Sequence, residues 1–124
     1  MLTIRIPALP VSVNHAFPTN RQGRRFKSSE YKKWCVLVEA HMPKAPFYLS
    51  SAPLSVEIDF CSPQWLTKAG GIRKADLDNR IKCCLDAVFA HLPVDDSHVF
   101  ELKVTKVLGD EYKTEVRIFD LRLS

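Results

Sequence analysis

The sequence has 124 residues, of which 46% are hydrophobic and 26% charged, with a formal net charge of +4. This composition excludes a disordered chain, because enough apolar residues are present for one core, and the length predicts a single domain over residues 1–124. No apolar run approaches the roughly 20 residues of a membrane span, so we expect no membrane association. The basic charge favours a polyanionic partner, but a solvated surface with spare lysines explains it equally well.

The cysteines indicate a reducing compartment. The chain has four of them and no C-x-x-C pair, which argues against both a zinc site and a disulfide framework. The first ten residues lack the apolar stretch and cleavage site of a signal peptide. We therefore expect reduced core thiols in a cytoplasmic protein.

The first third of the chain predicts a strand, a loop and a helix. Residues 2–6 alternate between apolar and polar, which is typical of a strand. Residues 10–25 carry Pro, Asn and Gly and are predicted to be a loop with a turn at 20–23. Ser28 or Ser29 caps the helix that follows, and Trp34 lies on its apolar stripe, which predicts a core position.

That helix ends at Pro43, and a proline-bearing linker over residues 43–53 leads to a second strand. Residues 54–60 alternate and form this strand. Residues 62–74 then make a long loop that contains two adjacent glycines and that we expect to be mobile.

Both loops carry basic residues and predict contacts with phosphates. Their side chains are either a DNA-binding surface or simply solvated, and the sequence alone does not decide between the two. Trp65 lies on no apolar stripe and is predicted to contact the substrate. The candidate DNA-binding residues of the loops are Arg21, Arg24, Arg25, Lys27, Trp65, Lys68, Arg73 and Lys74.

The second half predicts a helix and two strands. Apolar residues recur at helical spacing between Leu77 and Leu92, with a helix expected over 78–91. Strands follow over 98–108 and 112–120, joined as a hairpin at Gly109–Asp110. The order β-α-β-α-β-β predicts an α+β fold, in which two helices cover one face of a four-stranded mixed sheet.

Aspartates frame this second helix. Asp76 and Asp78 open it, while Asp95 and Asp96 follow its end. An N-cap explains one such carboxylate but not two pairs. Two carboxylates about 4 Å apart repel by roughly 4 kcal/mol, so a cluster of them requires a cation or protonation. Oxygen ligands suit Mg²⁺ or Mn²⁺, and a calcium loop is excluded because Ile81 occupies its glycine position.

Lys82 lies on the exposed side of the same helix, one turn after Asp78. It either serves a phosphodiester substrate or forms an i,i+4 ion pair with Asp78 or Asp86. Asp86 is predicted to be an ion-pair partner and not a metal ligand.

The run DLDNRIKCCLDAVF, followed by DD, resembles the signature of the RusA family of endodeoxyribonucleases, which are Holliday junction resolvases. The segment PVSVNHAF is similar to the family's Pro-rich, Asn-containing segment, which adds Asn14 to the candidate DNA-binding residues. The resemblance implies a homodimer that requires Mg²⁺ and nicks four-way DNA junctions symmetrically. It makes Asp76, Asp78 and Asp96 essential acids and Lys82 the essential lysine, with Asp95 as an assisting or alternative ligand.

Geometry favours metal sites shared between two chains. A helix over 78–91 rises about 20 Å, whereas the return to Asp96 spans at most about 17 Å. Two such helices packed antiparallel across a twofold axis would let Asp76 and Asp78 of one chain meet Asp95 and Asp96 of the other. If the helix stops near Val88, a site within one chain becomes possible.

The predicted mechanism is metal-assisted phosphodiester hydrolysis. Two other functions fit the same residues. One is a non-catalytic junction-binding protein, and the other is a less selective nuclease acting on branched DNA.

Overall fold

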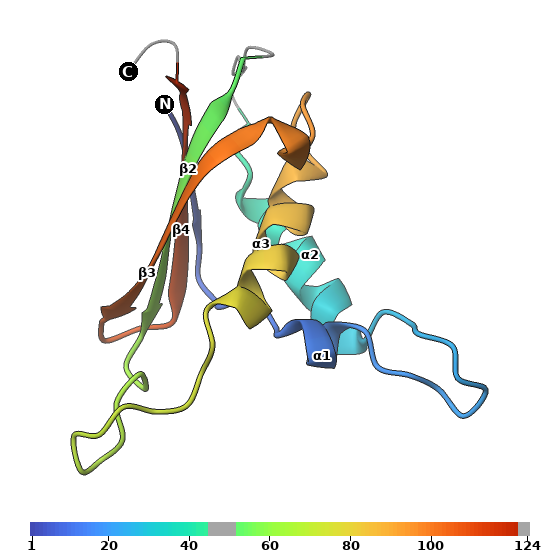
Figure 1. The fold of residues 1–124 in the computed structure, drawn as a ribbon, viewed down its shortest axis with the longest axis vertical. Coiled ribbons are helices and arrows are strands. Elements are labelled where there is room, and N and C mark those ends of the chain that lie inside the picture. The colour runs from blue at the N-terminus through green and yellow to red at the C-terminus, as the bar shows by residue number, and fades with distance from the viewer. Residues whose placement is uncertain (45–51, 122–124) are drawn as a thin grey trace.

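The computed structural model describes residues 1–44 and 52–121. The chain forms a four-stranded mixed sheet with its helices on one face (Figure 1), which confirms the predicted α+β class. The elements are β1 (Leu2–Ile6), α1 (Val13–Ala16), α2 (Ser29–His41), β2 (Leu54–Ser62), α3 (Asp78–Phe89), the 3-10 helix η1 (Asp96–His98), β3 (Val99–Leu108) and β4 (Lys113–Asp120). The predicted linker over 43–53 lies mostly outside the described residues.

The sheet order is β1-β4-β2-β3, with β2 and β3 parallel and β4 antiparallel to both of its neighbours. The predicted hairpin between β3 and β4 is therefore wrong, because β2 lies between them. The Gly109 N–H donates to the Ser62 carbonyl over 3.3 Å, so the turn crosses the end of β2. The side chains of β2 that face the helices are all apolar up to Phe60 and fully buried. A strand with such an apolar face is best placed in the middle of the sheet, where β2 lies.

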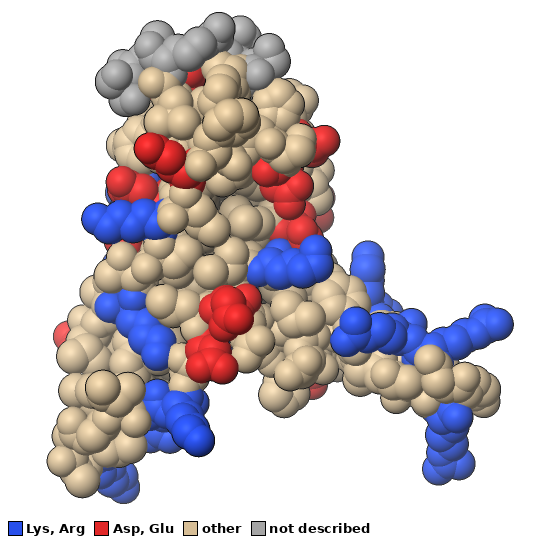
Figure 2. Space-filling model, in the orientation of Figure 1, with Lys and Arg blue, Asp and Glu red and all other residues tan. Residues whose placement is uncertain are grey.

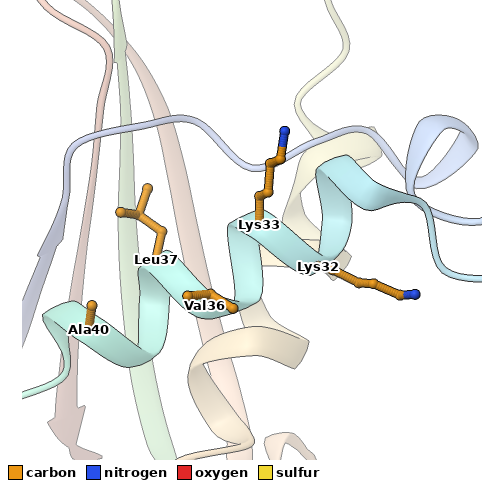
Figure 3. Close-up of a pocket in the computed structure, with 5 residues that line it drawn as sticks. All are labelled: Lys32, Lys33, Val36, Leu37 and Ala40. Carbon is orange, nitrogen blue, oxygen red and sulfur yellow. The ribbon is translucent and has the colours of Figure 1, made fainter.

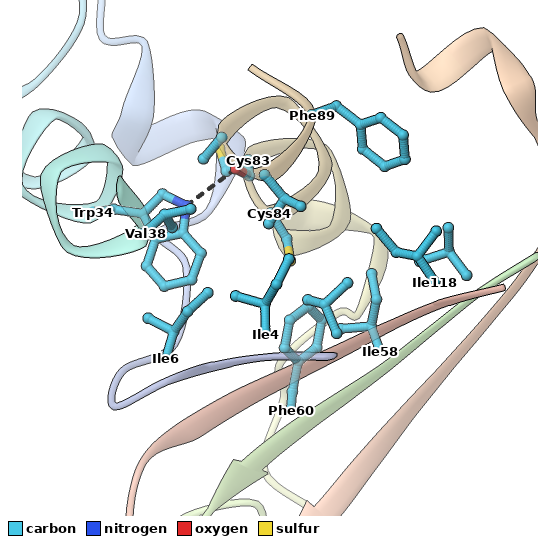
Figure 4. Close-up of a cluster of buried hydrophobic side chains, with 14 of the residues drawn as sticks. Ile4, Ile6, Trp34, Val38, Ile58, Phe60, Cys83, Cys84, Phe89 and Ile118 are labelled. Carbon is cyan, nitrogen blue, oxygen red and sulfur yellow. Dashed lines mark hydrogen bonds between the residues drawn. The ribbon is translucent and has the colours of Figure 1, made fainter. Parts of the chain in front are cut away.

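The core lies between this sheet and the helices. Figure 4 shows Trp34 and Val38 of α2 and Cys84 of α3 pointing toward sheet residues that include Ile4 and Ile58. Trp34 is 3% exposed, and its indole N–H donates to the Cys83 carbonyl over 3.1 Å, which ties α2 to α3. The prediction that Trp34 belongs to the core is confirmed. All four cysteines are free thiols.

Side-chain caps fix where the first two helices begin. Ser28 caps α2 by accepting a hydrogen bond from the Tyr31 N–H, as predicted. Ser12 caps the short helix α1 in the same way. The loop predicted over residues 10–25 therefore contains a helical turn that its Pro and Asn content did not indicate. No helix in the described ranges is long and apolar enough to cross a bilayer.

The opposite face of the sheet carries a network of ion pairs. Arg117 lies 3.1 Å from Glu57, 3.0 Å from Asp59 and 2.6 Å from Glu115, which also pairs with Arg5. The hydrogen bonds that Arg117 donates to Asp59 and then to the two glutamates raise its pKa. These cations are neutralised by their own chain, so this face is a poor candidate for binding a polyanion.

Candidate active site

Two exposed carboxylates lie at the start of α3, Asp76 two residues before the helix and Asp78 at its first residue. Leu77 occupies the N-cap position with helical backbone angles and no side-chain cap, so neither Asp76 nor Asp78 caps the helix. Within the described ranges, neither carboxylate forms a hydrogen bond or an ion pair. The capping interpretation is therefore wrong. Two uncompensated negative charges in neighbouring positions are chemically suited to bind a cation.

Lys82 lies one turn further along α3. Its Nζ is 3.0 Å from Oδ2 of Asp86, which confirms that Asp86 is an ion-pair partner. The hydrogen bond and charge of Asp86 raise the pKa of Lys82, and the charge of Asp96 adds to the effect. The ammonium is therefore held protonated, and its side chain is 63% exposed and accessible to a substrate phosphate.

In the second acidic pair, one carboxylate forms hydrogen bonds within its own loop and the other is exposed to solvent. Asp95 caps η1, and it accepts hydrogen bonds from both the backbone N–H and the hydroxyl of Ser97. These bonds lower the pKa of Asp95. Asp96 is exposed and close enough to Lys82 to influence it electrostatically. Of the two, Asp96 is therefore the better candidate for a metal ligand.

The two acidic pairs do not converge within one chain. The helix ends at Phe89, two residues earlier than expected and one residue after Val88, the end at which a site within one chain becomes possible, so the length of α3 does not by itself separate the pairs. Over residues 1–44 and 52–121, no group of three or more His, Cys, Asp or Glu is arranged to hold a metal ion. A single chain thus provides suitable oxygen donors at both ends of α3, but not a complete metal site.

Arg80 holds the N-terminal segment against the start of α3, a role that the sequence did not indicate. Its guanidinium donates to the Pro10 carbonyl, and burial lowers its pKa. The adjoining helix α1 packs against α3 and carries Asn14 with an exposed side chain. Asn14 is thereby placed beside the helix that bears the acidic residues.

Two hairpins project on either side of α3 (Figure 1), and we call them the first arm (residues 17–27) and the second arm (residues 63–75). The first arm is closed by a bridge between Thr19 and Arg25, with Gly23 at φ 78° in its turn. The second is closed by a bridge between Leu66 and Ile72, with Gly70 at φ 84°. The long loop that was expected over residues 62–74 therefore contains a hydrogen-bonded hairpin.

The arms carry the predicted basic residues, all of them exposed. None of these side chains forms an ion pair with a residue that the structure describes. Figure 2 shows basic side chains on both arms, with an acidic patch between them at the level of the first turn of α3. The cations are Arg21, Arg24, Arg25 and Lys27 on the first arm, and Lys68, Arg73 and Lys74 on the second.

Trp65 does not have the exposure expected of a substrate contact. It is 7% exposed and belongs to the core, and its indole N–H donates to the Phe60 carbonyl over 2.9 Å. The Lys106 ammonium lies 5.1 Å from the centre of its ring. The prediction that Trp65 contacts the substrate does not agree with this burial, and the residue instead anchors the base of the second arm.

A separate hollow follows the outer side of α2 and is lined by Lys32, Lys33, Val36, Leu37 and Ala40 (Figure 3). It contains no carboxylate, so it is not part of the acidic site.

Comparison with known families adds an independent finding. The family model described as endodeoxyribonuclease RusA matches residues 7–119, which include α3, both arms and both acidic pairs. No curated protein matches the chain.

Proposed function

Because the chain belongs to the RusA family of endodeoxyribonucleases, we propose that it resolves four-way DNA junctions as a homodimer by Mg²⁺-dependent hydrolysis of phosphodiesters. The observation that carries the proposal is the family match over the same residues that place uncompensated aspartates between two basic arms. Such a surface is suited to a branched polyanion, because phosphates contact the arms while a cation offsets the repulsion of the carboxylates.

The proposed metal ligands are Asp76, Asp78 and Asp96, with Asp96 supplied by the second chain and Asp95 assisting. This division follows from the incomplete donor set of one chain, in which the two pairs lie at opposite ends of α3. Carboxylate oxygens are the ligands that Mg²⁺ prefers, and Mn²⁺ is an acceptable substitute. A bound divalent ion at such a site polarises a phosphoryl oxygen and lowers the pKa of bound water.

Lys82 is proposed to stabilise the negative charge that develops on the attacked phosphate. Its pKa is raised by Asp86, so it carries its charge throughout the physiological range. Asp86 also keeps the flexible side chain near the surface of α3, and a phosphate has to compete with it for the ammonium.

The arms are proposed to hold the backbones of separate duplexes of one junction. Figure 2 shows basic side chains of both arms on the same face of the molecule as the acidic patch. Phosphate contacts position a duplex but carry little sequence information. We therefore expect the selectivity to depend mainly on the shape of the branched substrate.

The test is a nicking assay on a synthetic four-way junction, with flap and linear duplexes for comparison. We expect Mg²⁺-dependent, symmetric nicks in the junction, and Asp76→Asn to abolish them while junction binding persists. Asp110→Asn, a change of another exposed aspartate, is the matched control and should retain activity. Tight binding without nicks would indicate a non-catalytic junction-binding protein, and equal cleavage of all substrates would indicate a less selective nuclease.

A further inference from the structure

Among residues 1–44 and 52–121 no strand pairs with the outer edge of β3, and we propose that a second copy of this chain pairs with it antiparallel, with Leu102 opposite Leu102 at the twofold axis. This inference rests on the proposed function, since it names the surface through which the second chain would complete the metal site. It rests equally on the exposure, the charges and the topology of β3.

The outer edge of β3 offers a long row of backbone groups. The strand has ten residues and is last in the sheet, so it has β2 on one side and no described strand on the other. A long edge of this kind is a template for pairing with another chain. Its apolar side chains are unusually exposed, with Phe100 at 71% and Leu102 at 43%.

The helix layer of one chain covers β3 only in part, since Val104 packs against the core while Leu102 and Leu108 are 43% and 59% exposed. Val56 of β2 points into the core and is fully buried, whereas Leu102, its register partner on β3, keeps 43% of its surface exposed. Residues paired across two strands point to the same face of a sheet, so Leu102 lies on the helix side. Space above β3 is therefore available for elements of a second chain.

The charges on β3 select one register. In a symmetric antiparallel pair, the helix side of one sheet must continue as the helix side of the other. Two residues that lie directly opposite each other must therefore point to the same face, so their sequence numbers differ by an even number. With Leu102 at the axis, Glu101 of each chain lies opposite Lys103 of the other chain, which gives two equivalent pairs of opposite charge. An axis at Glu101 or at Lys103 would oppose like charges, and an axis at Val104 would leave both residues unpaired. Lys106 does not interfere, because it lies over Trp65 of its own chain.

This register brings the two acidic pairs together. Because β2 and β3 are parallel and α3 connects them, α3 begins near the C-terminal ends of both strands and ends near their N-terminal ends. With Leu102 at the axis, Leu108 of one chain comes level with the partner's Asp96. The start of α3, with Asp76 just before the helix and Asp78 at its first residue, therefore lies level with the second acidic pair of the other chain.

The experiment is sedimentation velocity over a range of protein concentrations. Glu101→Lys and Lys103→Glu should each weaken the dimer on the order of 30-fold, because each turns two attractive pairs into two repulsive ones. An equimolar mixture of the two variants should restore a dimer, since every charged pair is then complementary, and the double swap within one chain should do the same. The matched controls are Lys33→Glu and Glu39→Lys on α2, which should leave the dimer unchanged.

Three results would overturn the inference: a wild-type chain that stays monomeric, single variants that dimerise like the wild type, or a mixture that does not recover. The wild-type chain is assayed for junction nicking in parallel, which separates the two proposals. If the chain nicks junctions as a dimer that is insensitive to the β3 charges, the proposed β3 interface is wrong and the proposed nuclease activity stands. If the dimer depends on the β3 charges but never nicks branched DNA, the proposed interface stands and the proposed nuclease activity is wrong.

Discussion

The Nζ of Lys82 lies 3.0 Å from Oδ2 of Asp86, one turn further along α3 and on the side that faces solvent. An exposed i,i+4 pair adds only about 0.3–0.5 kcal/mol to stability. The pair therefore matters for the availability of the ammonium and very little for the fold.

We predict that Asp86→Asn changes junction nicking by no more than about threefold, because the exposed pair that it removes is weak. Lys82→Met should instead lower single-turnover nicking about 10²–10³-fold, since it removes a charge proposed to act in the transition state. Thermal unfolding of both variants controls for folding. If Asp86→Asn were as damaging as Lys82→Met, Asp86 would itself belong to the active site.

The second prediction separates Asp95 from Asp96. Asn caps a helix about as well as Asp does, and Asp95 is proposed only to assist Asp96, so Asp95→Asn should preserve η1 and retain most of the nicking activity. Asp96→Asn should abolish nicking at ordinary Mg²⁺ and raise the Mg²⁺ concentration needed for any residual activity. Titrations of nicking against Mg²⁺ for the two variants provide the measurement, with a chelator as the zero point. The reverse pattern would assign the ligand to Asp95.

Periodicity predicted the elements well, because it reports which face of each segment is buried. Residues 2–6 and 54–60 alternate and are strands, and the stripe that contains Trp34 is helical. Periodicity does not report which strands are neighbours. The Gly109–Asp110 turn is a local signal, and the insertion of β2 between β3 and β4 is a long-range packing effect that a dipeptide cannot encode.

The same limit explains the error at Trp65. No apolar stripe at helical or strand spacing includes it, yet Trp65 is buried, with a hydrogen bond to the Phe60 carbonyl and the Lys106 ammonium over its ring. The two aspartate pairs could be identified from the sequence because clustered carboxylates repel each other and are unusual without a cation, whatever their place in the fold. The end of α3, which lies between the two pairs, was predicted to within two residues.

The third prediction tests the structural role of Trp65. Trp65→Phe removes the hydrogen bond to the Phe60 carbonyl and should lower the free energy of unfolding by about 1–2 kcal/mol. Junction affinity, measured at a temperature where the variant is fully folded, should be unchanged. A variant of wild-type stability that had lost affinity would show instead that Trp65 contacts DNA.

The fourth prediction concerns alkaline pH. Burial raises the pKa of Cys84 to about 12, against an ordinary value of 9.0. Below pH 9 the thiol is protonated in both states, so its contribution to stability is fully present. Between pH 9 and 12 the unfolded chain loses this proton first, and stability falls by at most about 1.4 kcal/mol per pH unit. Urea unfolding at pH 8, 9 and 10 should show a smaller loss for Cys84→Ala than for the wild type, and equal losses would contradict the assignment.

The fifth prediction concerns how the arms bind DNA. Their cations have no ion-pair partner among the described residues, so counterions or phosphates must neutralise them. Each phosphate contact contributes about 0.9 to the slope of log affinity against log salt concentration. Replacing Arg24 and Arg25 by Gln should therefore reduce the magnitude of that slope by up to about 1.8, with weaker junction binding at low salt.

Lys44→Gln, at the far end of α2 from the first arm, is the control for this experiment and should leave the slope unchanged. The double variant should also lose affinity for duplexes of different sequence by the same factor, because phosphate contacts are common to all of them. An unchanged slope with lower affinity would mean that these arginines support the hairpin structurally. A loss confined to one sequence would mean that they contact bases, which would make the first arm an element of sequence recognition.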